Sequence, residues 1–399
     1  GGLCICSFKY SGVTVRGNGG KCEYINTNGD LVRIEDSLGL AHKDFTSSYP
    51  ARQTLDSMPT GKPMWHGNVE SRAELNMLLK KYHCVFYLEL TDVNIKKGVT
   101  CPYIPSSKCI CSNKERKEML KVNGKVVKAG KVLIAVTELD FKWIKRQYTA
   151  KSIRVFNMIC FKKGKMPDWL KNEVFEYFQN KCTLKGVNDL LYAKSKNMLN
   201  SVYGMTATAI VRDSYKMNDD YILTKQKQDD DDKESALNKY YRSYNNFMPY
   251  QYAIYTTAHS RDALYTMIEC TGDNDGIDDY INDIYDLTDV YKNFLYCDTD
   301  SVFYLETPEN KPRMNTYAEQ CRKRATNGGA YVGNKFLGEP TDEPPLRAFR
   351  AIHSKCYAME EYNKKKKKYA LNVVIAGIPK KSIKWQRGEP VSRTNAQEL

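Results

Sequence analysis

The sequence predicts an α+β protein made of two or three domains or subdomains. The chain has 399 residues, which is too long for a single hydrophobic core of ordinary size. Residues 187–204 carry apolar side chains at helical spacing, which predicts an amphipathic helix. Residues 293–305 carry two aromatic and β-branched runs around a polar centre, which predicts a β-hairpin. Helices and antiparallel strands are therefore both expected in this chain.

In the predicted helix, the apolar side chains fall on one stripe, at offsets of 4, 11 and 15 residues from the first: Val187, Leu191, Met198 and Val202. We expect this stripe to face a core. Lys196, Asn200 and Tyr203 fall on the opposite face and are expected to point outward together. Gly204 stands where a helix C-cap is usual.

The predicted hairpin has two acidic residues at its tip. Strands are expected at Phe294–Tyr296 and Val302–Leu305, and the residues between them include Asp298 and Asp300. Residues 213–248 differ from both patterns, because they are polar and rich in Asn and Tyr. Their acidic run, Asp229 to Asp232, is expected in a solvated loop of an insertion.

The composition is typical of a soluble globular protein, with 42% hydrophobic and 27% charged residues. There is no run of about eighteen apolar residues and no secretory signal pattern, so we expect neither a membrane span nor export. The 61 Lys and Arg residues exceed the 47 Asp and Glu residues, giving a net charge of +14. This balance favours a polyanionic partner such as nucleic acid.

The 13 cysteines, an odd number, are expected as reduced thiols. Cys101, Cys109 and Cys111 lie close together in sequence, and Cys4 and Cys6 are candidates to join them. Their spacing is not that of zinc sites built from paired C-x2-C elements. Buried free thiols are the favoured interpretation, and a structural zinc site is the open alternative.

Three short motifs occur in order: Asp44–Pro50 (DFTSSYP), Lys196–Gly204 (KNMLNSVYG) and Tyr296–Ser301 (YCDTDS). Each has an ordinary structural explanation alone, as a turn, a solvated helix face or a hairpin tip. Together they supply the groups for phosphoryl transfer onto a 3′-hydroxyl, which uses two divalent ions about 3.5–4 Å apart. Asp44 and Asp300 are the expected bridging carboxylates, with Asp298 nearby. Lys196 is expected to neutralise a triphosphate.

These motifs resemble motifs A, B and C of family-B DNA polymerases: D-x-x-S-x-Y-P, K-x-x-x-N-S-x-Y-G and Y-x-D-T-D-S. Lys355-Cys356-Tyr357 resembles the K-x-Y motif of the protein-primed branch, the terminal-protein-dependent enzymes of phages and linear plasmids. Ala376-Gly377-Ile378 with Lys380 and Lys381 resembles the palm-to-thumb passage of that branch. Gly1-Gly2 resembles the end of its Y-x-G-G motif, without the Tyr.

The resemblance implies a role for each matched residue. The implied catalytic residues are Asp44, Asp298, Asp300 and Lys196, and the implied metal ligands are Asp44, Asp298, Asp300 and the Phe45 carbonyl. The implied nucleotide-binding residues are Phe45, Ser47, Tyr49, Lys196, Asn200 and Tyr203, with Tyr49 under the deoxyribose, where it excludes a 2′-hydroxyl. The implied DNA-binding residues are Ser201, Gly204, Thr299, Ser301, Lys355, Tyr357, Lys380 and Lys381. The implied cofactor is a pair of Mg²⁺ ions, with Mn²⁺ as a substitute.

The fold implied is a right-hand polymerase, with an antiparallel-sheet palm, helical fingers, a partial thumb and two insertions. The palm is expected at 1–55 and 249–375, the fingers at 168–205 and the start of the thumb at 376–399. The insertions are expected at 56–167, a first terminal-protein region that contacts the priming protein, and at 206–248, a second region whose β-hairpin supports processivity. A 3′–5′ exonuclease is not expected in this chain, because no D-x-E motif stands in a suitable context; it would be truncated or belong to another chain.

The function implied is template-directed addition of deoxynucleotides to a 3′-hydroxyl, or to a terminal-protein hydroxyl, in replication of a linear genome. The expected partners are template-primer DNA, deoxynucleoside triphosphates and a terminal protein, in the cytoplasm (the host cytoplasm for a phage protein). A polymerase that copies RNA and a catalytically inactive DNA- or terminal-protein-binding module are the alternatives. The lysine run Lys364–Lys368 is compatible with either a solvated turn or a phosphate contact.

Overall fold

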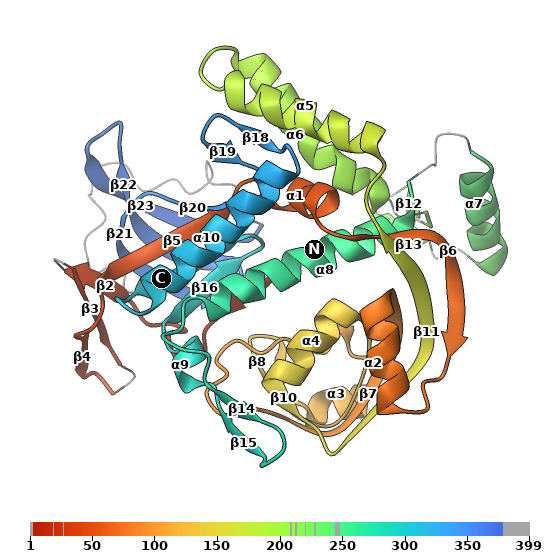
Figure 1. Ribbon diagram of the computed structural model, residues 1–399, viewed down its shortest axis with the longest axis horizontal. Coiled ribbons are helices and arrows are strands. Elements are labelled where there is room, and N and C mark those ends of the chain that lie inside the picture. Colours follow the sequence, from red (N-terminus) through yellow and green to blue (C-terminus); the bar gives the residue numbers. More distant parts are fainter. Residues whose placement is uncertain are drawn as a thin grey trace.

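The structure is a computed structural model that describes residues 3–18, 20–26, 28–207, 210–211, 214–219, 221–226, 229–243 and 248–377. It confirms the α+β fold class, with two large antiparallel sheets joined by long helices (Figure 1). Gly1, Gly2, Ile378, Lys380 and Lys381 lie outside the described residues. Within the described part of the chain, no helix has the length and apolar character that crossing a membrane requires.

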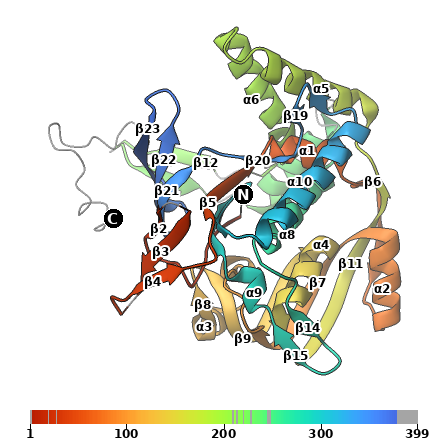
Figure 2. The same cartoon turned by 60° about the vertical axis from the view of Figure 1, so that its left-hand side comes forward.

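The first sheet has eleven strands in the order β1-β16-β17-β5-β21-β2-β3-β4, with β20 paired to β5 and with β22 and β23 continuing from β21. The bounds are β1 Cys4–Cys6, β2 Val15–Asn18, β3 Lys21–Ile25, β4 Leu31–Ile34, β5 Gly39–Phe45, β16 Phe294–Asp298, β17 Ser301–Glu306, β20 Pro340–Asp342, β21 Leu346–His353, β22 Cys356–Asn363 and β23 Lys368–Ile375. Helices α8 (Tyr250–Glu269) and α10 (Asn310–Asn327) cover one face, as Figures 1 and 2 show. Small elements flank it: α9 Thr288–Tyr291, β14 Ile277–Asp279, β15 Ile284–Asp286, β18 Tyr331–Val332 and β19 Lys335–Phe336.

Strands β16 and β17 are buried on both faces, which explains their continuous apolar runs. One face packs against the helices. On the other face, Phe303 stacks on Phe349 of β21 with ring centroids 4.5 Å apart, and Tyr357 of β22 lies 5.0 Å from Tyr296. The β21–β22 ribbon therefore closes an aromatic core over the sheet and fixes the rigid base of the hairpin tip that carries Asp298.

The second sheet has six strands in the order β6-β11-β7-β9-β8, with β10 paired to β7. The bounds are β6 Met58–Gly67, β7 Tyr82–Ile95, β8 Leu120–Val122, β9 Lys125–Thr137, β10 Tyr148–Thr149 and β11 Ser152–Gly164, and its helices are α2 Arg72–Lys81, α3 Asn113–Glu118, α4 Glu138–Gln147 and the 3₁₀ turn η1 Ser106–Lys108. All of these strands lie within residues 56–167. The family resemblance had implied an insertion in this range, and no sheet had been predicted for it.

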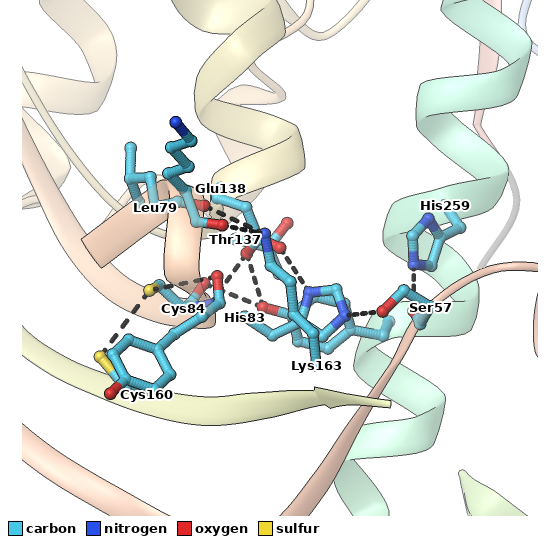
Figure 3. Close-up of polar contacts among 12 residues, drawn as sticks. Ser57, Leu79, His83, Cys84, Thr137, Glu138, Cys160, Lys163 and His259 are labelled. Atoms are coloured by element: carbon cyan, nitrogen blue, oxygen red, sulfur yellow. Dashed lines mark hydrogen bonds and ion pairs between the residues drawn. The ribbon is translucent and has the colours of Figure 1, made fainter. Parts of the chain in front are cut away.

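A buried polar network joins the second sheet to helix α8, which covers the first sheet (Figure 3). His83 of β7 lies between Glu138 of α4, with Nδ1 2.6 Å from Oε1, and Ser57, with Nε2 3.0 Å from Oγ. Tyr255 of α8 donates to the other oxygen of Glu138 at 2.6 Å, and His259 of α8 lies 2.7 Å from the Ser57 carbonyl oxygen. Because Ser57 follows α1 (Ser48–Leu55) directly, this network holds α1, α8 and the second sheet in one arrangement.

A buried ion pair strengthens the same junction. Arg261 of α8 donates through Nε to Oδ1 of Asp140 in α4 at 2.8 Å and to the Tyr103 hydroxyl at 3.1 Å. The second oxygen of Asp140 accepts from the backbone and hydroxyl of Thr137, which caps α4. The neighbouring Arg261 holds the pKa of Asp140 below its usual value despite the cost of burial. Both partners are therefore charged in the folded protein.

Helices α5 (Asp168–Thr183) and α6 (Asp189–Thr206) form a pair that projects from the first sheet (Figure 2). The helix predicted over 187–204 is confirmed, but its predicted buried stripe is wrong except at Val202. Val187 is 79% exposed, Leu191 44% and Met198 41%. The side chains that face the core lie about one residue further round the helix: Ser195, Leu199, Val202 and Thr206.

Both ends of the helix also differ from the prediction. Asn188 is the N-cap, with Oδ1 accepting from the backbone of Leu191 at 3.0 Å, so Val187 precedes the helix. Gly204 is not the C-cap, because the helix continues to Thr206. The outward-facing prediction for Lys196 and Asn200 is correct, since both are exposed.

Residues 206–248 contain a two-stranded hairpin, β12 (Ser214–Met217) and β13 (Leu223–Gln226), followed by helix α7 (Asp230–Arg242). The acidic run is therefore not a loop, as had been expected, but the start of a helix. Asp229 caps this helix by accepting from the backbone of Asp232 at 2.8 Å. Carboxylates in a first turn also interact favourably with the positive end of the helix dipole.

Candidate active site

The predicted hairpin is confirmed, and its tip lies at the end of β5. Asp298 pairs with Ser301 across the hairpin, and the backbone of Asp300 donates to the Asp298 carbonyl at 2.7 Å. Thr299 adopts a left-handed conformation with φ 61°, which the tight turn requires. Ser301 in turn pairs with Asp44 of β5, and the backbone of Phe45 donates to the Asp300 carbonyl at 3.0 Å. Two motifs about 250 residues apart in sequence thus share one sheet edge.

Asp44 and Asp300 are half-buried and carry shifted pKa values. Burial raises the pKa of Asp44 to about 7, and the charges of Asp300 and Glu343 add to the effect. Burial and then the charge of Asp298 raise the pKa of Asp300 to about 6. Both carboxylates resist ionisation because they are desolvated and repel one another. A bound divalent cation would stabilise their charged forms.

Asp298 is placed differently, because it forms an ion pair with Lys355 at 2.8 Å and accepts from the Thr299 hydroxyl at 3.0 Å. Among the described residues, no three or more His, Cys, Asp and Glu side chains are grouped to hold a metal ion, which applies to Cys101, Cys109 and Cys111 as well. A cation at this edge would therefore be held by Asp44 and Asp300 with further oxygen atoms, such as the Phe45 carbonyl. Oxygen donors of this kind suit Mg²⁺.

Lys181 of α5 is a basic residue of the site that sequence reasoning missed. Its ammonium donates to the Ser47 hydroxyl at 2.7 Å, and its charge counteracts the raised pKa values of both Asp44 and Asp300. Burial lowers the pKa of Lys181, and the nearby Lys196 lowers it further. The sequence clue to Lys181 was its position in the helix that directly precedes the helix of the second motif. Lys181 therefore puts a cation opposite the carboxylates, and Lys196 lies near Lys181.

Glu343 is a second residue that sequence reasoning missed. It follows β20, whose Thr341 pairs with Asp44, and its backbone donates to the His42 carbonyl at 3.0 Å. Burial raises the pKa of Glu343, and its charge is one of the causes of the raised pKa of Asp44. No spacing relation links it to the three motifs, so only the strand pairing reveals it.

Tyr49 and Tyr203, from the first and second motifs, pack against each other with ring centroids 4.5 Å apart. Ser47, in a left-handed conformation with φ 55°, turns the chain from β5 into α1 and so directs Tyr49 toward α6. Burial raises the pKa of Tyr49 to about 12, with the Tyr203 ring as the next cause. The two phenols form one wall beside the carboxylates.

Lys355 and Tyr357 lie on the other side of the hairpin tip. The Lys355 backbone donates to the Tyr296 hydroxyl at 2.8 Å, and Tyr357 packs in the aromatic core. Of the remaining candidates, Ser201 and Gly204 are exposed on α6, whereas the Phe45 side chain and Ser301 are buried. The structure therefore brings Asp44, Asp300 and Lys181 together, with the tyrosine pair alongside, and leaves the α6 candidates on an open surface.

Comparisons with known proteins identify the family. Residues 19–285 match the family model described as DNA polymerase type B, organellar and viral. The chain belongs to this family. No curated protein matches the chain.

Solved structures of Phi29 DNA polymerase share the fold of this chain. A ternary complex with primer-template DNA and incoming nucleotide has a TM-score of 0.61 and 16% identity, covering 95% of this chain and 53% of that one. An orthorhombic crystal form has a TM-score of 0.60 and 16% identity, covering 96% and 54%. The chain thus spans about half the length of these relatives. The predicted right-hand polymerase fold is confirmed.

Proposed function

We propose that this chain carries the polymerising site of a protein-primed DNA polymerase, which adds deoxynucleotides to a primer hydroxyl on a DNA template. The observation that carries the proposal is the pairing of Asp44 with Ser301, which sets Asp44 beside Asp300, with Lys181 opposite them. Family membership and the shared fold support it. Template-primer DNA and deoxynucleoside triphosphates are the proposed ligands, by analogy with the Phi29 polymerase complexes.

The mechanism we propose is positioning and charge stabilisation. Divalent ions, when bound, supply activation of the primer hydroxyl and neutralisation of the leaving pyrophosphate. Asp44 and Asp300 would hold them, and Lys181 and Lys196 would bind the triphosphate from the fingers side. Tyr49 and Tyr203 would pack on the sugar and base of the nucleotide, and Lys355 and Tyr357 would steady the primer end.

Protein priming is supported by two features outside the sheet of the active site. The second sheet, β6–β11, lies in the range proposed as the first terminal-protein region, and the β12–β13 hairpin lies in the range proposed as the second. We propose that the first region contacts a priming protein and the second supports processive copying.

The test is primer extension by the purified chain on a defined template. We expect template-directed addition of deoxynucleotides with Mg²⁺ or Mn²⁺ and none with EDTA. Binding of primer-template without extension under any of these conditions would favour the inactive binding module. Equal extension on an RNA template would favour the RNA-copying alternative.

A further inference from the structure

The turn between β22 and β23 presents five consecutive lysines, Lys364–Lys368, all exposed. The Asn363 side-chain oxygen accepts from the backbones of Lys365 and Lys366, each at 3.1 Å. Lys367 adopts a left-handed conformation with φ 50°, and Lys368 pairs with Asn363 to close the turn. The lysine tip, residues 364–368, is therefore an organised turn rather than an irregular loop.

The lysine tip forms no ion pair within the described part of the molecule. No described acidic side chain forms an ion pair with it, whereas Lys21, Lys97 and Lys142, also exposed, each have a carboxylate partner. Adjacent ammonium groups repel one another, and the repulsion is relieved when an anion binds between them. The tip is thus a candidate site for an anionic ligand, and strand pairing shows where it lies.

The lysine tip is close to the strand that carries Asp44. Glu343 bonds to His42 of β5, and two residues later the Pro345 carbonyl accepts from the backbone of Tyr362 at 2.9 Å, next to the tip. This path allows a separation of at most roughly 20 Å between β5 and the tip. In Figures 1 and 2 the hairpin points toward the same end of the molecule as the α5–α6 pair.

Glu343 connects the lysine tip to the fingers. Burial and then the charge of Glu361 raise its pKa, while Lys185 and Lys364 oppose this rise. Lys185 comes from the turn after α5, one helical turn beyond Lys181. Lys185 and Lys364 therefore approach the same carboxylate from opposite elements, beside Asp44.

We propose that the lysine tip and Lys185 form a polyphosphate-gathering site, which attracts the triphosphate of the incoming nucleotide and the pyrophosphate product to the mouth of the active site. The proposal rests on the proposed polymerase function and deepens it. Cations lining the approach to a site raise the local concentration of an anionic substrate, and the effect falls with ionic strength.

Two placements favour polyphosphate over the DNA backbone. The proposed primer contacts, Lys355 and Tyr357, lie at the opposite end of β22 from the tip, about 25 Å away along an eight-residue strand. Lys185 follows the end of α5 that carries Lys181, and Lys181 approaches Asp44. The tip therefore lies on the nucleotide side of the carboxylates.

The test compares two variants with equal loss of charge. The tip variant carries Lys364→Gln, Lys365→Gln, Lys366→Gln and Lys368→Gln, and leaves Lys367 for its turn conformation. The control carries Lys9→Gln, Lys21→Gln, Lys311→Gln and Lys323→Gln, which are exposed outside the two proposed terminal-protein regions. Because every substituted side chain is exposed, both variants are expected to fold.

At saturating primer-template and low salt, we expect the tip variant to show about a tenfold higher KM for deoxynucleotide and a similar weakening of pyrophosphate inhibition. The difference should shrink at high salt, Lys185→Gln should act in the same direction, and the control should match the wild type. Wild-type extension with equal KM for both variants would overturn the inference and leave the polymerase function intact. An unchanged KM with weaker primer-template binding would assign the tip to DNA instead. Absence of extension by the wild type would refute the polymerase function itself.

Discussion

In the absence of metal, the charges of Asp44 and Asp300 lower the free energy of unfolding. Removal of one charge is therefore expected to stabilise the protein. We expect Asp300→Asn to raise the free energy of unfolding in EDTA at pH 8, because it removes one of two desolvated groups at one sheet edge. If Asp44 is treated as an isolated group, the rise of its pKa from 3.8 to about 7 on folding lowers the free energy of unfolding by about 4 kcal/mol at pH 8. For Asp300, with a pKa of about 6, the figure is about 3 kcal/mol.

The net gain expected is about 2–3 kcal/mol, because the Asn amide stays partly buried and part of the repulsion between the two carboxylates is already counted in the figure for each. For a chain of this length, that is about 2–4 °C in Tm. The folded state binds these protons more tightly than the unfolded state does, so wild-type stability is lost as pH rises from 3.8 toward 7. The advantage of the variant should therefore fall to about half or less by pH 5.

The assay is thermal unfolding in EDTA at pH 8 and pH 5, with Asp36→Asn as an exposed control. Added Mg²⁺ should raise the Tm of the wild type and leave that of Asp300→Asn nearly unchanged, because the variant has lost a ligand. An Asp300→Asn protein no more stable than the wild type in EDTA at pH 8 would refute the reasoning. A gain that is independent of pH would show that electrostatic repulsion is not its cause.

Three further outcomes are expected. Tyr49→Val should raise the ratio of ribonucleotide to deoxynucleotide incorporation, because it removes the ring that would clash with a 2′-hydroxyl; an unchanged ratio would exclude Tyr49 as the sugar gate. Replacing residues 218–245 with a short Gly/Ser linker should preserve addition of the first nucleotides but shorten products under a DNA trap, and unchanged products would make this segment dispensable. Asp140→Asn should cost about 3–5 kcal/mol by leaving Arg261 unpaired, and a double-mutant cycle with Arg261→Gln should show coupling, whereas simple additivity would argue against the ion pair.

The hairpin tip could be predicted because its signals are local. Continuous aromatic and β-branched runs define β16 and β17, and Asp298–Ser301 is too short to be anything but a turn between them. The proximity of Asp44 to Asp300 could be expected only from the chemistry that the three motifs supply together and from the family resemblance. It depends on pairing between strands distant in sequence, which no local pattern encodes.

The buried face of α6 could not be predicted from its apolar residues. Val187, Leu191 and Met198 suggested a buried stripe, but Ser195 and Thr206 are among the residues that pack inward, since small polar side chains fit close helix contacts. The second sheet was also not predicted, because charged residues interrupt the apolar pattern along its strands. A register shift also breaks the long pairing of β11 with β7. Tertiary packing decided both outcomes.

The central claim is that Asp44 and Asp300 carry nucleotidyl transfer, and single-turnover incorporation of one deoxynucleotide tests it most directly. With Mg²⁺ and saturating primer-template, Asp44→Asn and Asp300→Asn should each lose at least about a thousandfold in rate, since several kcal/mol of stabilisation of the transition state is removed. Primer-template binding should stay near the wild-type level, and Asp36→Asn should incorporate normally. Incorporation by either active-site variant within a few fold of the wild-type rate would contradict the assignment.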